Sequence, residues 1–337
     1  MKQYPKVLLH DHLDGGLRPE TIIEIADEIG YRKLPTTRVT ELADWFQKAC
    51  DSGSLIRYLE TFDHTIAVMQ REVDIVRVAR ETVIDLAADG VIYAEVRVAP
   101  EHFTKNGLSL EAVTEAMLEG YRQGEAETGL KVNAILCGMR QLDKSQEVAE
   151  IVVKYRDKGV VGFDIAGPEK GFAPIRQKDT FDYLRKHQVP FTIHAGEADG
   201  PESIDLALNA CKAKRIGHGV RIVDDLPNGR IARQVLEEQI HLEICPTSNL
   251  QTGVADIYSS HPIGKLFELG FNIGINTDNR LMSHTSMSHE FEESARAFGW
   301  GLAEFRELTL CAMNAAFTDD KTSYLQRIGA AYDQLQR

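Results

Sequence analysis

Eight short apolar runs, rich in β-branched residues, recur along the 337-residue chain and alternate with longer segments of helical apolar spacing. A chain in which strands alternate with helices packs as parallel βα units, so the pattern predicts an α/β fold. Eight units are the number that closes a (β/α)8 TIM barrel, and a doubly wound sheet is the alternative. The runs are KVLLHDH, VIYAEVRVA, KVNAILCG, VGFDIAG, PFTIHAGE, RIGHGV, HLEICPTSN and FNIGINTD.

The first two runs are separated by residues 13–90, which is more chain than one crossover helix requires. In a barrel, extra helices inserted after strand 1 would lie over the carboxyl ends of the strands, beside an active site. Single barrels reach this chain length, so residues 1–337 are expected to form one hydrolase barrel domain. The inserted segments with helical spacing are residues 21–30, 39–50, 54–70 and 72–90.

Charge, apolar run length and cysteine content limit the partners and the cellular location of the protein. The net charge of −13 argues against nucleic acid or an anionic lipid surface, because both attract clusters of Lys and Arg. No stretch approaches the roughly 20 apolar residues of a membrane span, and the N-terminus lacks the pattern of a signal peptide. The five cysteines form no C-x-x-C pair. We therefore expect a cytoplasmic protein with reduced cysteines.

Polar residues gather at the carboxyl ends of the predicted strands. In a (β/α)8 barrel these ends meet at one mouth, and catalytic groups come from several of them. The residues are therefore expected to lie close together although they are far apart in sequence. They are His10 and His12 in the first run, Gly167 in the fourth, His194 and Glu197 in the fifth, His218 in the sixth, and Asp278 and Asn279 in the eighth.

His10 and His12 together predict a metal site. Side chains alternate faces along a strand, so both imidazoles point into the barrel while Asp11 points outward. Two imidazoles in a buried mouth are costly without a partner, and a metal ion is such a partner. His194 and Asp278 would supply a third nitrogen and a carboxylate oxygen. Three histidines and one aspartate, with room for water, suit a catalytic zinc ion.

The ordered set of motifs LLHDHLDGGLRPETI, FDIAGPE, FTIHAGE, RIGHGV, CPTSN and INTDN resembles the adenosine deaminase family. The resemblance extends from about residue 7 to 280, in the same order as in the family. It implies a (β/α)8 barrel with one zinc ion per subunit at its mouth. It also implies hydrolysis of adenosine or 2′-deoxyadenosine to inosine or deoxyinosine plus ammonia, within purine salvage. The small-molecule partner would then be a purine nucleoside.

The resemblance also implies roles for individual residues. The zinc ligands would be His10, His12, His194 and Asp278, and Glu197 would serve N1 of the purine. His218 would orient the water or take its proton, and Asp278 could share that task. Zinc lowers the pKa of a bound water to about 7, which provides a nucleophile for C6. Glu197, if protonated, would donate to N1 as the ring loses aromaticity.

Substrate contacts are implied in the same way. Asp14 matches the aspartate that binds a ribose hydroxyl, and Gly167 matches the glycine whose N–H meets N3. His12 would border the substrate as well as ligate the metal. An apolar gate over the base is implied for Leu55, Tyr58, Leu59 and Phe62, which share one helical face. That spacing suits simple core packing equally well.

Asn279 marks a departure from the family. Many members have Thr-Asp-Asp where this chain has Thr277-Asp278-Asn279. The second aspartate is thought to hydrogen-bond the purine N7, which is an acceptor. An aspartate must be protonated to donate there, whereas an asparagine donates through its NH2 at any pH. We therefore expect Asn279 to keep the N7 contact.

Three alternative functions are considered. The first is a deaminase of adenine or of a modified adenosine monophosphate. Asp14 favours a sugar hydroxyl over a phosphate, because a carboxylate would repel a 5′-phosphate. The second is a zinc-dependent amide or ester hydrolase, since barrels carry many chemistries. The third is a non-catalytic nucleoside-binding or cell-surface interaction protein, which the presence of Glu197 and His218 beside all four ligands disfavours. The other zinc deaminase signature, H-x-E with P-C-x-x-C, is absent from the sequence.

Overall fold

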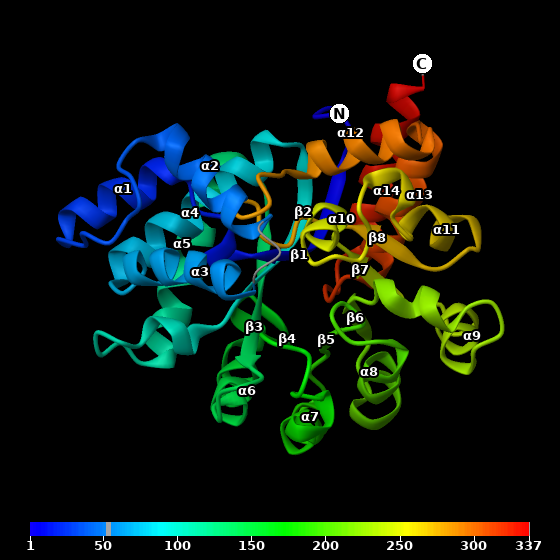
Figure 1. Ribbon diagram of the computed structural model, residues 1–337, viewed down its shortest axis with the longest axis horizontal. Coiled ribbons are helices and arrows are strands. Elements are labelled where there is room, and N and C mark those ends of the chain that lie inside the picture. The colour runs from blue at the N-terminus through cyan, green and yellow to red at the C-terminus, as the bar shows by residue number, and fades with distance from the viewer. Residues whose placement is uncertain (52–54, 337) are drawn as a thin grey trace.

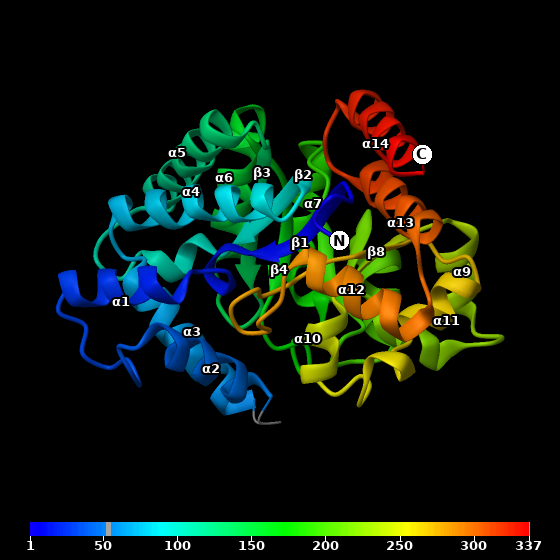
Figure 2. The ribbon, with the colours of Figure 1, turned by 90° about the horizontal axis from the view of Figure 1, so that it is seen from above.

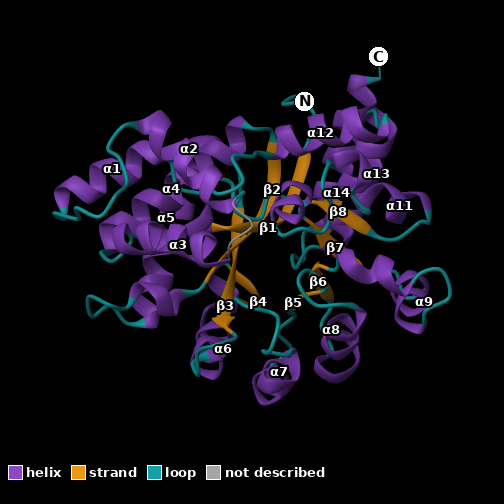
Figure 3. Ribbon diagram, viewed as in Figure 1, coloured by secondary structure: helices purple, strands orange, loops and turns teal. Residues whose placement is uncertain are grey.

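Eight parallel strands form the centre of the molecule and helices surround them (Figures 1 and 3). The computed structural model describes residues 1–51 and 55–336, and for residues 55–60 it describes the helix but not the side chains. The strands are β1 (Lys6–His12), β2 (Val91–Val98), β3 (Val132–Met139), β4 (Val160–Ala166), β5 (Thr192–Ala195), β6 (Arg215–His218), β7 (His241–Ile244) and β8 (Ile273–Ile275).

The strands pair as two parallel sheets, β1-β2-β3-β4 and β5-β6-β7-β8. Two bridges join the sheets into a closed barrel. Phe163 in β4 pairs with Phe191, which precedes β5, and Asp11 in β1 pairs with Asp278 beyond β8. The predicted (β/α)8 barrel is therefore confirmed, and the doubly wound alternative is wrong.

Each predicted apolar run contains one strand, but the later strands are shorter than their runs. The run HLEICPTSN forms a strand only as far as Ile244, and α10 (Pro246–Gln251) begins directly afterwards. Proline has no N–H for a strand ladder, yet its fixed φ suits the first turn of a helix. The polar end of this run therefore lies in a helix at the mouth of the barrel.

Helices follow the strands around the outside of the barrel. The best predicted is α5 (Leu110–Thr128), where the Ser109 hydroxyl accepts a hydrogen bond from Ala112 N and Gly129 ends the helix with φ 75°. None of the described helices combines the length and apolarity needed to cross a membrane. The other helices after β2 are α6 (Ser145–Tyr155), α7 (Lys178–Lys186), α8 (Pro201–Asp205), α9 (Arg230–Glu237), α11 (Ile263–Glu268), α12 (Met287–Phe298), α13 (Leu302–Ala315) and α14 (Lys321–Leu335).

Within its described residues, the predicted insertion after β1 forms four α-helices, and they divide into two groups. The helix α4 packs along α5 outside the barrel, as the crossover helix to β2 (Figure 2). The other three lie on the side where the strands end, because α3 contacts the short 3-10 helix η1 (Leu13–Gly15) that follows β1. Gln251 at the end of α10 also donates to Asp51, 2.8 Å away. The inserted helices are α1 (Pro19–Glu28), α2 (Val39–Cys50), α3 (Leu55–Val68) and α4 (Glu72–Ala88).

Charged side chains fill part of the barrel interior beneath the mouth. Glu95 and Arg97 occupy alternate positions of β2 and so share its inner face. Arg97 donates to Glu243 at 2.7 Å and to the Leu9 carbonyl at 2.6 Å, and it also pairs with Asp164. Arg97, Glu243 and Asp164 are fully buried, so their charges need one another in place of water.

Arg215 continues this buried network toward the opposite end of the barrel. It pairs with Glu243 and Glu95, each at 2.7 Å, and donates to the Ala315 carbonyl at 3.0 Å. Its guanidinium also lies over the Phe317 ring, 3.7 Å from the centroid. The segment between α13 and α14 is thereby attached to the inner face of the barrel.

Arg215→Met should lower the free energy of unfolding by about 3–5 kcal/mol, because it leaves the buried carboxylate of Glu95 without its cation and Glu243 with Arg97 alone. Chemical denaturation of the purified variant measures this loss. The matched control is Arg122→Met, which breaks the exposed pair with Glu119 on α5 and should cost less than about 1 kcal/mol. Equal losses for the two variants would contradict the structural role of Arg215.

Candidate metal centre and active site

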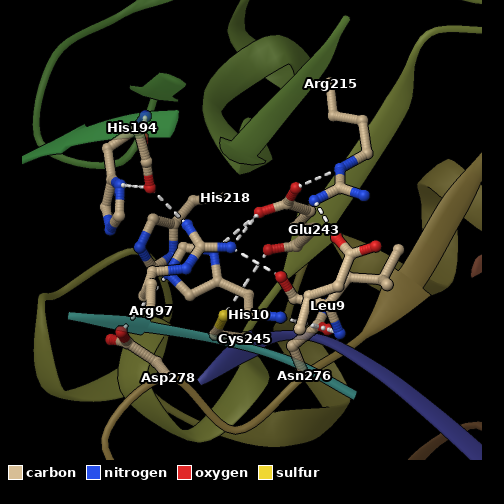
Figure 4. A network of polar contacts seen from close by, with 12 residues as sticks. Leu9, His10, Arg97, His194, Arg215, His218, Glu243, Cys245, Asn276 and Asp278 are labelled. Carbon is tan, nitrogen blue, oxygen red and sulfur yellow. Dashed lines mark hydrogen bonds and ion pairs between the residues drawn. The ribbon is translucent and has the colours of Figure 1, made fainter. Parts of the chain in front are cut away.

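Four titratable side chains, carried by β1, β5, β6 and the turn after β8, converge at the mouth of the barrel (Figure 4). Among the described residues, His10, His194, His218 and Asp278 have potential ligand atoms that all lie within 4.8 Å of one another. His12 joins them, since its Nε2 is 3.3 Å from Asp278 Oδ1 and 3.3 Å from His194 Nε2. The structure therefore brings together all four predicted ligands and adds His218 to the group.

The backbone is unusual where the strands carry these residues. His218 and Asp278 have φ values of 59° and 58°, in the left-handed region that residues with a side chain seldom adopt. Gly167 and Gly196 occupy the same region at the ends of β4 and β5. Strained positions persist where the surrounding structure requires them, and they often occur at functional sites. Here both strained residues belong to the cluster of potential ligands at the mouth.

The two ring nitrogens of His10 face different groups, one a carboxylate behind the ring and the other the cluster. Its Nδ1 lies 3.0 Å from Glu243 Oε2, while its buried Nε2 has no hydrogen-bond partner among the described residues. That Nε2 faces Asp278 Oδ1 at 3.4 Å. A buried polar atom without a partner requires an explanation, and a carboxylate behind the ring is the arrangement found for metal-binding histidines.

His194 is oriented in a similar way. Its Nδ1 lies 2.8 Å from Asp164 Oδ2, which leaves Nε2 directed toward His12. Asp164 Oδ1 also accepts from the backbone N–H of His194 at 3.2 Å. Because Arg97 contacts both Asp164 and Glu243, one guanidinium supports the carboxylates behind two of the histidines.

The protonation states suit a metal site. Burial lowers the pKa values of His12, His194 and His218, which keeps these imidazoles neutral and free to donate a lone pair. Burial alone would raise the pKa of Asp278, but the adjacent imidazoles of His10, His12 and His218 hold it well below the usual value. Ser248 Oγ donates to Asp278 Oδ2 at 2.6 Å and leaves Oδ1 facing the histidines. For His10, burial and the charge of Arg97 are outweighed by Asp278 and Glu243, so its pKa is raised instead and a metal ion would displace a proton from that ring. With His10 deprotonated, the imidazoles and one carboxylate form a donor set that fits a divalent zinc ion.

Glu197 and His218 form a second pair beside this cluster. Burial raises the pKa of Glu197 to about 8, and the charges of Asp278 and Glu169 contribute to the same rise. His218 Nε2 lies 3.6 Å from Glu197 Oε2, and its Nδ1 lies 3.2 Å from the side-chain nitrogen of Asn249. A carboxyl that keeps its proton near neutral pH can act as a general acid.

The predicted substrate-contacting residues lie around the same mouth. Asp14 is buried in η1, and its Oδ1 has no hydrogen-bond partner among the described residues. Asn279 is buried against Gly15, where an added Cβ would be 2.0 Å from Asn279 Oδ1. The position of Gly167 is equally restricted, because a Cβ there would be 2.5 Å from Gln141 Oε1.

The predicted gate can be placed only in part. Phe62 is a half-buried residue of α3 that packs against the hydrophobic core. The side chains of Leu55, Tyr58 and Leu59 lie outside the described residues. The gate therefore stays a prediction.

Sequence reasoning missed the residues that orient the cluster. Asp164 and Glu243 are charged residues inside apolar runs, which is a signal that a buried partner is present. Glu169, Ser248 and Asn249 lie within the motifs FDIAGPE and CPTSN, but none of them is a charge inside an apolar strand, because Glu169 follows β4 and the other two lie in α10. His241, the first residue of the run HLEICPTSN, begins β7 and is buried, with Nδ1 2.8 Å from Asn272 Oδ1.

Asp14→Asn should stabilise the metal-free protein at alkaline pH. Burial raises the pKa of Asp14 from 3.8 to about 7. Between pH 3.8 and about 7 the carboxyl ionises in the unfolded chain but stays protonated in the folded protein, so the free energy of unfolding falls as the pH rises through this range. The asparagine removes this cost, which is roughly 2–4 kcal/mol above pH 7. The free energy of unfolding of both proteins, measured at pH 4 and pH 8, should differ only at pH 8. A difference of equal size at both pH values would contradict this explanation.

Comparison with known proteins relates this geometry to a family. The family model for adenosine deaminase matches residues 5–328. Adenosine deaminase 1 of Streptomyces coelicolor is 54% identical over 330 residues, covering 94% of this chain and 83% of that protein. The adenosine deaminase of Mycobacterium marinum is 49% identical over 330 residues, covering 94% of this chain and 91% of that protein.

Solved structures agree on the fold. An N6-mAMP deaminase from arabidopsis aligns with a TM-score of 0.85 at 26% identity, covering 99% of this chain and 98% of the other. An adenine deaminase from Arthrobacter aurescens aligns with a TM-score of 0.89 at 24% identity, covering 97% and 98%. An amidohydrolase from Burkholderia ambifaria, solved with bound zinc, aligns with a TM-score of 0.87 at 24% identity, covering 99% and 92%.

These comparisons agree with the geometry of the barrel mouth. The family match includes every strand and all the clustered histidines and carboxylates. The Streptomyces and Mycobacterium relatives share about half of their residues with this chain, over nearly its whole length. This chain belongs to the adenosine deaminase family of metal-dependent hydrolases.

Proposed function

We propose that this protein hydrolyses adenosine and 2′-deoxyadenosine to inosine and deoxyinosine plus ammonia, within purine salvage. The observation that carries the proposal is the pairing at one mouth of a metal-ligand cluster and a carboxyl whose pKa is raised to about 8. The relatives from Streptomyces coelicolor and Mycobacterium marinum are named adenosine deaminases, which supports the same substrate.

We infer that one zinc ion per chain is held by His10, His12, His194 and Asp278. The buried His10 Nε2 without a partner among the described residues supports this, as does the bound zinc in the amidohydrolase of similar fold. When bound, zinc lowers the pKa of a water molecule to about 7 and so supplies a nucleophile at neutral pH. Glu243 and Asp164 hold the rings of His10 and His194 in orientations that present Nε2 to the ion.

Glu197 is the proposed proton donor. Attack at C6 of the purine places negative charge on N1, and a donor aimed at N1 stabilises that charge. The raised pKa of Glu197 means that its carboxyl carries a proton at neutral pH. Asp278, within the same site, has a pKa well below its usual value and stays ionised. The two carboxyl groups thus take opposite roles because their surroundings differ.

His218 is the proposed base beside the nucleophile. It is neutral because burial lowers its pKa, and its position within the cluster allows it to orient a water molecule or accept its proton. The contact of its Nδ1 with Asn249 fixes the plane of the ring. Asp278 assists from the other side, anchored by Ser248.

The remaining mouth residues would bind the nucleoside. Asp14, buried with Oδ1 unpaired among the described residues, would accept from a ribose hydroxyl, and His12 would border the substrate. Gly167 would donate its N–H to N3, and the Asn279 NH2 would donate to N7. Phe62, with Leu55, Tyr58 and Leu59, would cover the base. The buried carboxylate of Asp14 favours a nucleoside over a 5′-phosphorylated substrate, although solved relatives are named adenine and N6-mAMP deaminases.

Two further proposals concern the protein as a whole. Residues 1–337 would form one domain, supported by a single large hydrophobic cluster that extends from Val7 to Tyr332. A cytoplasmic location is supported by the five free cysteines, four of which are buried packing residues.

The purified protein should convert adenosine to inosine, seen as a loss of absorbance near the adenosine band, and Glu197→Gln should lower kcat at least about 10²-fold. The amide cannot give a proton to N1, so binding should survive while turnover falls. Wild-type activity should also decline as pH rises toward about 8, where Glu197 loses its proton. A bound cation nearby would lower that pKa and move the decline to lower pH.

Adenine and AMP serve as substrate controls for this assay. Faster turnover of either one than of adenosine would reject adenosine as the substrate. If Glu197→Gln keeps the wild-type kcat, the proposed proton donor is wrong.

Metal removal tests the zinc proposal separately. Elemental analysis should find one divalent ion per chain, and chelation should abolish turnover until zinc is restored. His12→Ala should lose both metal and activity, because it removes one ligand from the cluster. Full turnover by protein shown to be free of metal would overturn the assignment.

A further inference from the structure

One buried carboxylate holds the loop that carries Glu197. Glu169 lies three residues beyond the end of β4 and is only 6% exposed. Its Oε1 accepts from the N–H of Gly196 at 2.7 Å. Its Oε2 accepts from three more N–H groups, those of Glu197 at 3.1 Å, Ala198 at 2.7 Å and Asp199 at 2.9 Å.

This loop has backbone donors that no strand or helix satisfies. The strand β5 ends at Ala195, and Gly196 turns the chain with φ 71°. Buried N–H groups are almost always paired, so four consecutive donors need an acceptor at this turn. A carboxylate offers about four acceptor positions on two oxygens, which matches the four donors. The segment after β5 is therefore wrapped around Glu169.

We propose that Glu169 is a positioning residue for Glu197, an inference that rests on the proton-donor role proposed above. The Glu197 peptide is held on both sides, since its N–H donates to Glu169 and its carbonyl accepts from Arg221 Nε at 2.5 Å. The backbone from which the Glu197 side chain extends is thus fixed before any substrate enters. A donor fixed in this way loses little entropy when it meets N1.

Other residues hold the proposed metal ligands, so the effect of Glu169 on Glu197 can be tested separately from any effect on metal binding. His194 lies within β5, and Asp164 contacts both its ring and its backbone N–H. Arg140 donates to the His194 carbonyl and, at 2.7 Å, to that of Phe172. None of these hydrogen bonds and ion pairs involves Glu169, whose charge nevertheless acts on Arg140. Its loss should therefore displace Glu197 while the metal ligands keep their places.

The electrostatics favour the same role. The charge of Glu169 is one of the causes that raise the pKa of Glu197, after burial and the charge of Asp278. Glu169 therefore holds the backbone of residues 196–199 and also favours the protonated form of Glu197.

Glu169→Gln is the direct test. Glutamine keeps the shape of the side chain but replaces one oxygen with an NH2 group, which meets at least one backbone N–H donor in either orientation. We expect kcat for adenosine to fall at least about 10-fold, because small displacements of a catalytic group are costly. The metal content and KM should stay near wild type. Hydrogen–deuterium exchange should become faster in the peptide that contains residues 196–199.

Asp225→Asn is the matched control. Asp225 Oδ2 accepts from the N–H groups of Ile231 and Ala232 at the start of α9, each at 2.9 Å, and lies outside the proposed machinery. This variant should lose stability and exchange faster at α9, with kcat unchanged. Glu169→Asp, which keeps the charge on a shorter arm, should give kcat between wild type and Glu169→Gln.

The outcomes separate this inference from the proposed function. If Glu197→Gln loses turnover while Glu169→Gln keeps wild-type kcat with faster exchange, the positioning role is wrong. Loss of metal from Glu169→Gln would also overturn the positioning role, since Glu169 would then support the metal site. If Glu169→Gln does not fold, wild-type kcat in Glu169→Asp with faster exchange would reject the role. Full turnover by Glu197→Gln would instead refute the proton-donor proposal itself.

Discussion

The buried pairing of Arg97 with Asp164 and Glu243 is the interaction on which the site depends. One guanidinium supports two carboxylates, and each carboxylate orients one histidine of the cluster. Buried ion pairs add little net stability, because desolvation offsets most of their attraction. Their value here is geometric, since a planar guanidinium with fixed donors holds both carboxylates at once. Arg215 extends the network below Glu243, so the mouth is coupled to the base of the barrel.

Burial at the mouth separates the protonation states of groups that are alike in water. Asp278 lies beside the imidazoles of His10 and His12 and accepts from the Ser248 hydroxyl, which favours its charged form. Glu197 lies beside other carboxylates, and burial opposes its charge. The proposed deaminase chemistry needs both an ionised ligand and a neutral acid, and the structure provides this pair through environment alone.

The family shows the class of reaction more firmly than the substrate. Relatives of high identity are named adenosine deaminases, whereas solved structures of similar fold include deaminases of adenine and of N6-mAMP. Those proteins share a barrel with this chain, and a barrel alone does not select a substrate. The choice therefore rests on residues such as Asp14, which is buried with Oδ1 unpaired among the described residues and is proposed to accept from a ribose hydroxyl.

The sequence by itself determined the barrel and the candidate ligands, because period-two spacing and strand-end positions are local properties. His10 and His12 could be placed on one face from two residues of spacing, and β1 has the predicted bounds. Tertiary structure alone decided which groups support them. Glu169 meets residues 196–199, and Glu243 meets His10, across large separations in sequence. Such partners are fixed by how the closed barrel brings strand ends together, and no local pattern encodes that proximity.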